Sequence, residues 1–278
     1  MKIAKRPSTS SERPSRLRSK YGYDHKWWGE PAPANPEADG SYWKATRRPL
    51  PCLVFILPLM ISYEIGVSRP GGIAVETWRA GADTWIRGGL HALGVTDRLF
   101  LPLALVMILL GWQAFDSRRW KFPPRILAGM AAESLTLGFV LIGLSRLVDF
   151  GLGRIEASAI LAATATHPTA SLVGFLGAGL YEETLFRLIL IPLLYYGLRL
   201  LQMPVMASNT LAVTISSLLF SLAHHAGLPA EPFTWYAFTF RWLAGIFFAW
   251  VFVVRGFGVA VGAHSAYDIL VGWLDLRL

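Results

Sequence analysis

The sequence predicts an all-α, polytopic transmembrane bundle of about seven or eight helices, together with one helix that lies in the membrane interface. Two observations carry this prediction. Hydrophobic residues make up 54% of the 278 residues and charged residues only 16%, whereas roughly a quarter of the residues of an ordinary soluble domain are charged. The apolar residues also gather in runs of about 20, the length that crosses the hydrocarbon core of a bilayer.

Residues 1–48 are expected to form a disordered, basic tail on the cytoplasmic side. This segment is rich in Ser, Pro, Lys and Arg and lacks periodic apolar residues. It holds 11 cationic and 5 acidic residues, so it carries +6 of the net charge of +8. Because a cationic flank marks the cytoplasmic side of a first span, we expect a multi-pass protein of the cell inner or plasma membrane with a cytoplasmic amino terminus. The charge distribution argues against nucleic acid as a partner.

The amino-terminal membrane helices are expected within residues 49–168. Apolar runs predict spans at residues 49–67, 99–115 and 126–147. Residues 75–93 instead place apolar side chains on one helical face, which is typical of a helix that lies in the interface or caps the bundle. The opposite face of that helix carries the charged residues Glu76, Arg79, Asp83 and Arg87.

A catalytic membrane core is expected at residues 169–278. Its first apolar segment, residues 171–201, is longer than a simple span needs, so we expect it to tilt, to kink near Gly177 to Gly179 or Pro192, or to extend beyond the membrane. Further helical segments are predicted by the apolar runs at residues 209–226, 233–254 and 256–274.

Residues 171–201 contain two adjacent carboxylates and a guanidinium. Charged groups are energetically expensive at membrane depth, so they indicate a functional site. On a helix, Glu183 and Arg187 are four residues apart and form a favourable acid-first pair. Glu182 is rotated by about 100° from Glu183 and continues the small-residue row of Gly174 and Ala178, along which another helix can approach closely. Glu182 is therefore the candidate general base.

Two histidines lie on later apolar segments. His224 follows Phe220 by four residues, and His264 precedes Asp268 by four. Two helices can thus each deliver an imidazole to the bundle interior, which together with a carboxylate can activate water and stabilise an oxyanion. His225 faces about 100° away from His224 and is interpreted as structural.

Other charged residues and other protease chemistries fit the sequence less well than this site does. Glu64 and Glu133 are expected to be satisfied by neighbouring helices. The zinc-protease pattern His-Glu-x-x-His and the serine-protease pattern Gly-x-Ser-Gly are both absent from the chain. Cys52 is the only cysteine, which excludes an internal disulfide and a cysteine-based metal cluster.

Taken together and in this order, three motifs resemble the CAAX protease and bacteriocin-processing family, which contains the type II CAAX prenyl endopeptidases and is also called the glutamic intramembrane proteases. The motifs are Glu182-Glu183-x-x-x-Arg187, Phe220-x-x-x-His224 and His264-x-x-x-Asp268. The resemblance covers about residues 170–275.

The resemblance implies that Glu182 and His224 activate the attacking water and that His264 and the residue at Asp268 stabilise the oxyanion, with Glu183 and Arg187 in support. The prenyl endopeptidases carry Asn at the position of Asp268. Because an ionised aspartate cannot donate a hydrogen bond, we expect Asp268 to orient His264 instead.

The function expected from these features is a metal-independent intramembrane endopeptidase without a cofactor. Its partners would be the bilayer and a membrane-associated peptide or protein, including a lipidated one. Three alternatives stay open. They are a non-catalytic immunity, scaffold or chaperone-like member of the same fold; a metal-dependent membrane protease with Glu182, His224 and His264 as ligands; and a proton-coupled transporter.

Overall fold

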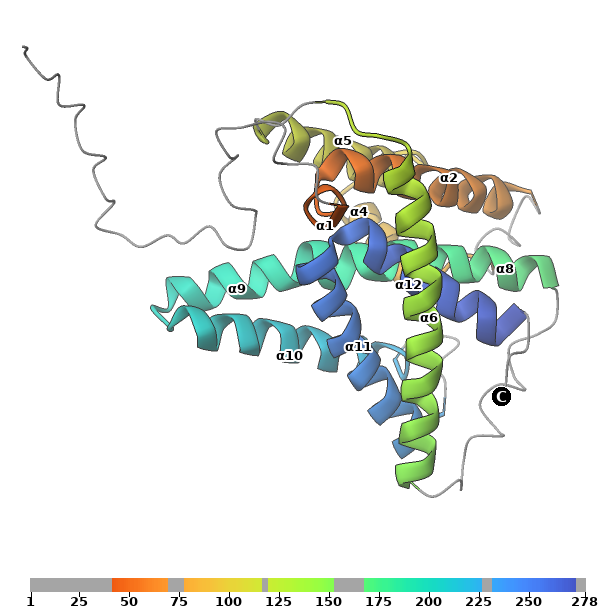
Figure 1. Ribbon diagram of the computed structural model, residues 1–278, viewed down its shortest axis with the longest axis vertical. Helices are drawn as coiled ribbons and strands as arrows, with labels where there is room; N and C mark the ends of the chain where they lie inside the picture. Colours follow the sequence, from red (N-terminus) through yellow and green to blue (C-terminus); the bar gives the residue numbers. More distant parts are fainter. Residues whose placement is uncertain (1–41, 70–77, 117–119, 153–167, 227–231, 274–278) are drawn as a thin grey trace, which may run out of the picture. The chain divides into compact units, whose positions relative to one another are not determined.

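The fold is a bundle of helices, seen in a computed structural model that describes residues 42–69, 78–116, 120–152, 168–226 and 232–273. Every regular element in these ranges is helical, which confirms the expected all-α class. The elements, shown in Figure 1, are α1 (Tyr42–Ala45), α2 (Pro49–Ser68), α4 (Gly81–Ala92), α5 (Phe100–Phe115), α6 (Arg125–Leu152), α8 (Pro168–Gly177), η3 (Ala178–Glu182), η4 (Thr184–Leu190), α9 (Ile191–Leu200), α10 (Val205–Ala223), α11 (Trp235–Arg255), α12 (Phe257–Asp268) and η5 (Ile269–Trp273).

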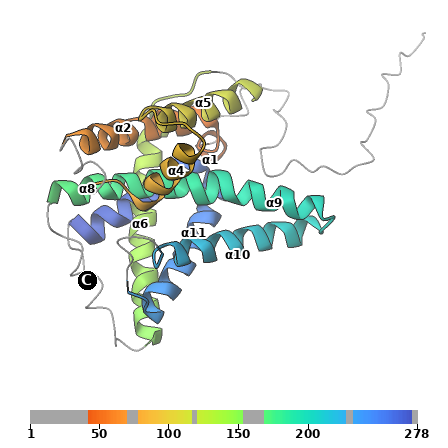
Figure 2. The ribbon, with the colours of Figure 1, turned by 180° about the vertical axis from the view of Figure 1, so that it is seen from behind.

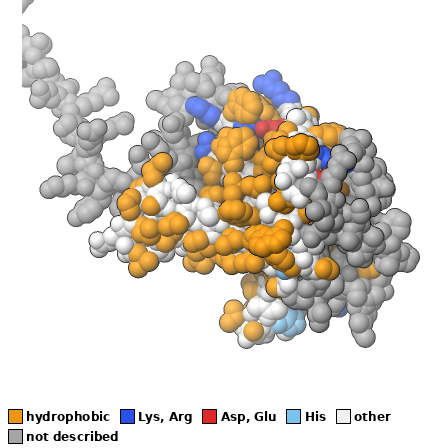
Figure 3. Space-filling view, turned by 90° about the horizontal axis from the view of Figure 1, so that it is seen from below, with side chains coloured by type: hydrophobic (Ala, Val, Ile, Leu, Met, Phe, Trp, Pro, Cys, Tyr) orange, Lys and Arg blue, Asp and Glu red, His pale blue; other side chains and the backbone are white. Residues whose placement is uncertain are grey.

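Four of the described helices, α2, α6, α10 and α11, are long and apolar enough to cross a membrane. The apolar helix α5 is shorter, with 16 residues. On the face shown in Figure 3, hydrophobic side chains dominate the centre of the described surface, while Lys and Arg side chains gather toward one edge. These features are those of an integral membrane protein, as the composition predicted.

Helix α12 forms the buried centre of the bundle. It packs against α6, α11, α2 and η3, and all its residues from Phe257 to Ser265 are buried. The chain enters α12 through Gly256, whose φ of 98° is a left-handed conformation that L side chains rarely adopt. The helix places His264 in the interior.

The first segment of the expected catalytic core forms one nearly continuous helical run, from α8 through η3 and η4 to α9 (Figures 1 and 2). Its middle is π-helical on both sides of Glu183, a distortion that is frequent at functional sites. The sequence predicted a kink in this region but not the wider helix.

Close approach to this run occurs at Gly179, and not along the predicted row of Gly174 and Ala178. A Cβ atom at Gly179 would lie 2.8 Å from the backbone nitrogen of Ser265 in α12, whereas one at Gly174 would have no neighbour within 4 Å. At Gly174, the predicted row therefore makes no close approach to another helix, and the close approach to α12 occurs at Gly179.

Residues 42–48, which the sequence placed in the disordered tail, belong to the folded part. Tyr42 donates its hydroxyl proton to Glu133 Oε2 at 2.6 Å, and Arg255 forms an ion pair with the same carboxylate. The Arg255 guanidinium also lies 3.9 Å from the ring centroid of Trp43. The expectation that Glu133 is satisfied by a neighbouring helix is confirmed. The expected tail residues 1–41 lie outside the described residues.

The short helix α4 has its polar face toward the protein. Asp83 is fully buried, whereas Trp85 on the opposite side is 40% exposed. The amphipathic pattern at residues 75–93 was therefore detected correctly, but its charges turn inward and bind α2. Residues 75–77 of the predicted helix, including Glu76, lie outside the described residues.

Candidate active site

Three elements bring the predicted catalytic residues together. Glu182 ends η3, His224 directly follows α10, and His264 lies within α12. Glu182 Oε2 lies 3.8 Å from His224 Nε2 and 3.8 Å from His264 Nε2. One carboxylate oxygen therefore faces two imidazoles from two other segments, although about 40 positions separate each member from the next along the chain.

His224 is oriented by its own helix. Its Nδ1 lies 2.9 Å from the carbonyl oxygen of Phe220, so Nδ1 donates this hydrogen bond and Nε2 faces Glu182. The neighbouring His225 points elsewhere, with its ring centroid 5.2 Å from that of Phe233. This separation of the two histidines agrees with the prediction from helical rotation.

His264 is oriented by Glu183. Its Nδ1 lies 2.8 Å from Glu183 Oε1, and the same oxygen lies 3.1 Å from Arg187 Nη1. The predicted pair of Glu183 and Arg187 is therefore present, and both side chains are buried. The contact between Glu183 and His264 was not predicted, because spacing along one helix reveals nothing about a residue 81 positions away.

Asp268 lies on the opposite side of the His264 ring from Glu183. Its Oδ2 is 3.6 Å from His264 Nε2, beyond hydrogen-bond distance. The carboxylate that holds His264 in place is thus Glu183, whereas Asp268 shares the Nε2 side with Glu182. From the Nε2 side of His264, the Asp268 side chain can contact a group that is bound between the two histidines.

Aromatic rings enclose the polar groups. The Phe248 ring stacks on His264 with centroids 4.5 Å apart and an interplanar angle of 14°. The Arg187 guanidinium lies 4.4 Å from the Phe220 centroid, and Arg187 Nη2 donates to the carbonyl oxygen of Gly245 at 3.2 Å. The sequence predicts only lipid-facing or packing roles for residues such as Phe248. Its place on the imidazole was missed because no motif includes it.

Glu182 is the carboxylate of the site with free hydrogen-bonding capacity toward both histidines. Its Oε2 is buried and makes no hydrogen bond with any described residue. A buried polar atom of this kind is uncommon and calls for an explanation such as a catalytic role or a bound water. The arrangement can hold a water between a base and two imidazoles, which is what hydrolysis without a covalent intermediate requires.

The described part of the chain contains no group of three or more His, Cys, Asp or Glu side chains with a geometry that could hold a metal ion. In the predicted metal alternative, His264 would be a ligand together with Glu182 and His224. Its Nδ1 is bonded to Glu183, which leaves only Nε2 for such a role.

All seven predicted site residues fall within one region of similarity. Residues 164–270 match the family model of type II CAAX prenyl endopeptidase Rce1-like proteins. The resemblance seen in the three motifs is thereby confirmed over this region. The match suggests a CAAX-type intramembrane protease and implies a peptidase. Searches of curated proteins and of solved structures gave no match.

Proposed function

We propose that the protein is a glutamic-type, metal-independent intramembrane endopeptidase that hydrolyses a peptide bond of a membrane-associated or lipidated substrate. The observation that carries this proposal is the position of Glu182 Oε2, unbonded and 3.8 Å from both imidazole Nε2 atoms. The match of residues 164–270 to the Rce1-like model supports the choice of peptide hydrolysis.

In the proposed reaction, a water lies between Glu182 and His224. Glu182 removes one proton as the water oxygen attacks the scissile carbonyl carbon, so that a tetrahedral intermediate forms without an acyl-enzyme. The proton held by Glu182 then passes to the leaving amine as the C–N bond breaks. His224 accepts a hydrogen bond from the water through Nε2, because its Nδ1 proton is directed at the Phe220 carbonyl.

The negative charge on the carbonyl oxygen would be stabilised from the α12 side. When protonated, His264 can donate from Nε2 to the oxyanion, while its Nδ1–H continues to donate a hydrogen bond to Glu183 Oε1. Asp268, 3.6 Å from the same Nε2, holds the imidazolium in its charged form and lies next to the oxyanion. Phe248 fixes the ring plane by stacking.

The surroundings of the site support a substrate that reaches it from the membrane. The histidines and carboxylates lie among helices that are long and apolar enough to span a bilayer. A peptide attached to a lipid, or to a membrane segment of its own, is concentrated at this depth, whereas a free soluble peptide is not.

The proposal is tested by cleavage of an internally quenched, farnesylated CAAX-type peptide with purified protein in lipid nanodiscs. We expect hydrolysis that is unaffected by EDTA and is lost in Glu182→Ala and in His224→Ala. Full activity in either variant would refute the activation of water by Glu182 and His224. Loss of activity with EDTA and its recovery with zinc would favour the metal-dependent alternative.

A non-catalytic role is the second candidate, and Asp268 is the observation in its favour. The prenyl endopeptidases carry an amide at this position, and a carboxylate replaces its donor group. If Glu182→Gln and His264→Ala restore a deletion phenotype as well as the wild-type gene does, the protein acts without hydrolysis.

A further inference from the structure

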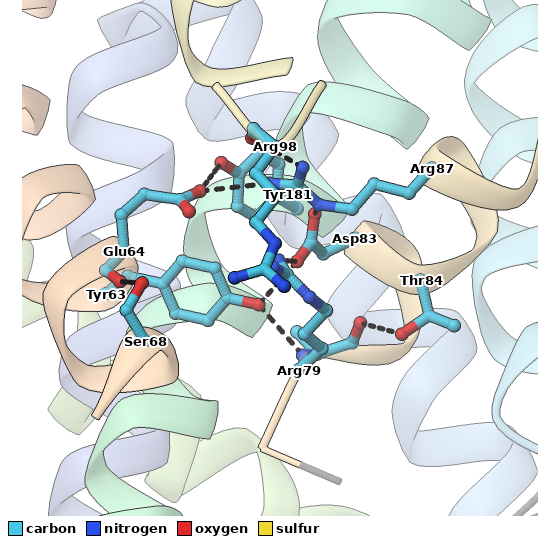
Figure 4. Close-up of polar contacts among 10 residues, drawn as sticks. Tyr63, Glu64, Ser68, Arg79, Asp83, Thr84, Arg87, Arg98 and Tyr181 are labelled. Carbon is cyan, nitrogen blue, oxygen red and sulfur yellow. Dashed lines mark hydrogen bonds and ion pairs between the residues drawn. The ribbon is translucent and has the colours of Figure 1, made fainter. Parts of the chain in front are cut away.

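A second group of buried and half-buried polar side chains lies beside the candidate site, between α2, α4 and η3. We call it the Tyr181 cluster; its members, drawn in Figure 4, are Tyr63, Glu64, Arg79, Asp83, Arg87 and Tyr181. Tyr181 is the chain neighbour of Glu182, so the cluster and the candidate active site meet at adjacent residues.

Asp83 of α4 forms the centre of this cluster. Its Oδ2 accepts hydrogen bonds from the Tyr63 hydroxyl at 2.8 Å and from Arg79 Nη1 at 2.6 Å. Its Oδ1 accepts one from Arg87 Nε at 2.6 Å. Although burial disfavours a charged guanidinium, the bond to Asp83 outweighs this effect and raises the pKa of Arg79 above its ordinary value. The Arg79 guanidinium therefore stays charged beside Asp83.

Glu64 of α2 connects these ion pairs to the π-helical segment. Its Oε1 accepts a hydrogen bond from Arg87 Nη2 at 3.2 Å and another from the Tyr181 hydroxyl at 2.6 Å. The Tyr181 ring also packs edge-on against Tyr63, with centroids 5.4 Å apart. Two carboxylates and two guanidiniums thus balance in charge, and each of them is paired within the cluster.

The helical run that passes from the end of α8 into η3 is wedged between α2 and α12 close to Tyr181. On the α2 side, a Cβ atom at Gly177 would clash with the Tyr63 ring. On the α12 side, a Cβ at Gly179 would clash with the Ser265 hydroxyl. The rotation of the segment about its axis therefore depends on side-chain contacts. The two chain neighbours of Glu182 both make such contacts, Glu183 with His264 of α12 and Tyr181 with Glu64 of α2.

We propose that the hydrogen bond from Tyr181 to Glu64 fixes the rotation of η3 and so directs Glu182 at His224 and His264, which makes Tyr181 and Glu64 positioning residues for the base. The inference rests on the proposed function for its kinetic effect. It predicts a geometric effect as well, which can be measured without any substrate.

A matched control exists in the same chain. Tyr42 donates to Glu133 Oε2 at 2.6 Å, the distance also found between Tyr181 and Glu64, and Glu133 keeps Arg255 as a partner just as Glu64 keeps Arg87. Tyr42→Phe and Tyr181→Phe therefore each remove one hydroxyl from a glutamate that stays ion-paired, although Tyr181 is fully buried and Tyr42 is half-buried. The two variants differ in position, because Tyr181 is the chain neighbour of Glu182 and Tyr42 is not.

The geometric test uses a cysteine pair, Glu182→Cys with His224→Cys, in a Cys52→Ser background, cross-linked by a short bifunctional methanethiosulfonate reagent. Added to this pair, Tyr181→Phe is expected to lower the initial cross-linking rate by about threefold or more, because the segment loses its hydrogen bond to α2 and orientations in which the two positions lie farther apart become more populated. Tyr42→Phe is expected to leave the rate unchanged. Equal rates in the Tyr181→Phe and Tyr42→Phe backgrounds would overturn the proposal, whether or not the protein hydrolyses any peptide.

The kinetic test uses the native active site and the farnesylated peptide. Tyr181→Phe is expected to lower kcat about tenfold while KM stays unchanged, because a displaced base affects the transition state more than substrate binding. Glu64→Leu should act in the same way, and Glu64→Gln should retain most of kcat, since its amide oxygen still accepts from Tyr181. A lower thermal midpoint with an unchanged kcat in Tyr181→Phe and Glu64→Leu would show a merely structural cluster and contradict the proposal.

Discussion

Two buried polar groups adjoin one another in this molecule, and they differ in how completely their charges are satisfied. In the Tyr181 cluster, each charged side chain has a partner between 2.6 and 3.2 Å. Across the peptide bond, Glu182 Oε2 has no hydrogen bond with a described residue, and its nearest cationic or imidazole partners are at 3.8 Å. The first arrangement is what stability requires, and the second leaves bonding capacity for a reactant.

Glu183 combines features of both arrangements. Its Oε1 is paired with Arg187 and His264, as in the Tyr181 cluster, whereas its Oε2 makes no hydrogen bond with a described residue. It therefore serves both the fold and the site. Four substitutions test this contrast.

The largest effect is expected from Glu182→Gln. Removing the base should lower kcat by about a thousandfold or more, while the thermal midpoint stays near that of wild type, because the Oε2 atom has no hydrogen bond to lose. Both quantities are to be measured on the same preparation. A large fall in the midpoint would mean that Glu182 is a structural residue like Asp83.

Asp83→Asn should show the opposite pattern. It removes the carboxylate charge that pairs with Arg79 and leaves Arg87 with Glu64 alone, and breaking a buried ion pair destabilises a protein by about 3 to 5 kcal/mol. Denaturant titration in detergent micelles measures this loss. The exposed Asp97→Asn, whose side chain still accepts from the Leu99 amide, is the control and should change stability little. An equal free energy of unfolding in Asp83→Asn and wild type would show that the Tyr181 cluster does not stabilise the fold.

Glu183→Gln should lower both kcat and the thermal midpoint. The amide oxygen can still accept from His264, but the charge that pairs with Arg187 is lost, so we expect kcat to fall about ten- to a hundredfold and the thermal midpoint to fall as well. Activity and melting are measured together. A fall in kcat alone would mean that Glu183 serves only the candidate site, and a fall in the thermal midpoint alone would mean that it serves only the fold.

Asp268→Asn is expected to have the smallest effect. An amide at this position can donate a hydrogen bond to the oxyanion, so kcat should rise by about two- to tenfold, with no change in the thermal midpoint. Steady-state kinetics with the farnesylated peptide measure the change. A fall in kcat would show that the carboxylate itself takes part in the reaction.

Much of the fold was predictable because span length and apolarity are local properties of the sequence. The apolar runs placed both ends of α2 and α5 and the start of α6 to within about one residue, inside the usual uncertainty of helix ends. The end of α6 lies at Leu152, beyond the predicted residue 147. The order of the three motifs likewise identified Glu182, His224 and His264, which the structure brings together.

The missed features all depend on contacts between distant segments. An amphipathic pattern does not say which face turns inward, although charges at membrane depth usually face the bundle, and this rule would have oriented α4 correctly. The folding of Tyr42 onto Glu133 and the bond from His264 to Glu183 link residues 91 and 81 positions apart. The close approach of α12 at Gly179, where a Cβ atom would lie 2.8 Å from the Ser265 backbone nitrogen, likewise joins two distant segments.

The central claim is that Glu182 activates a water directly. A single turnover in H₂¹⁸O, with EDTA present, tests it by locating the label. Direct attack by water predicts one ¹⁸O atom in the new carboxylate of the product and none in the protein. Label in the side chain of Glu182, with unlabelled product, would reveal a covalent anhydride and contradict the claim.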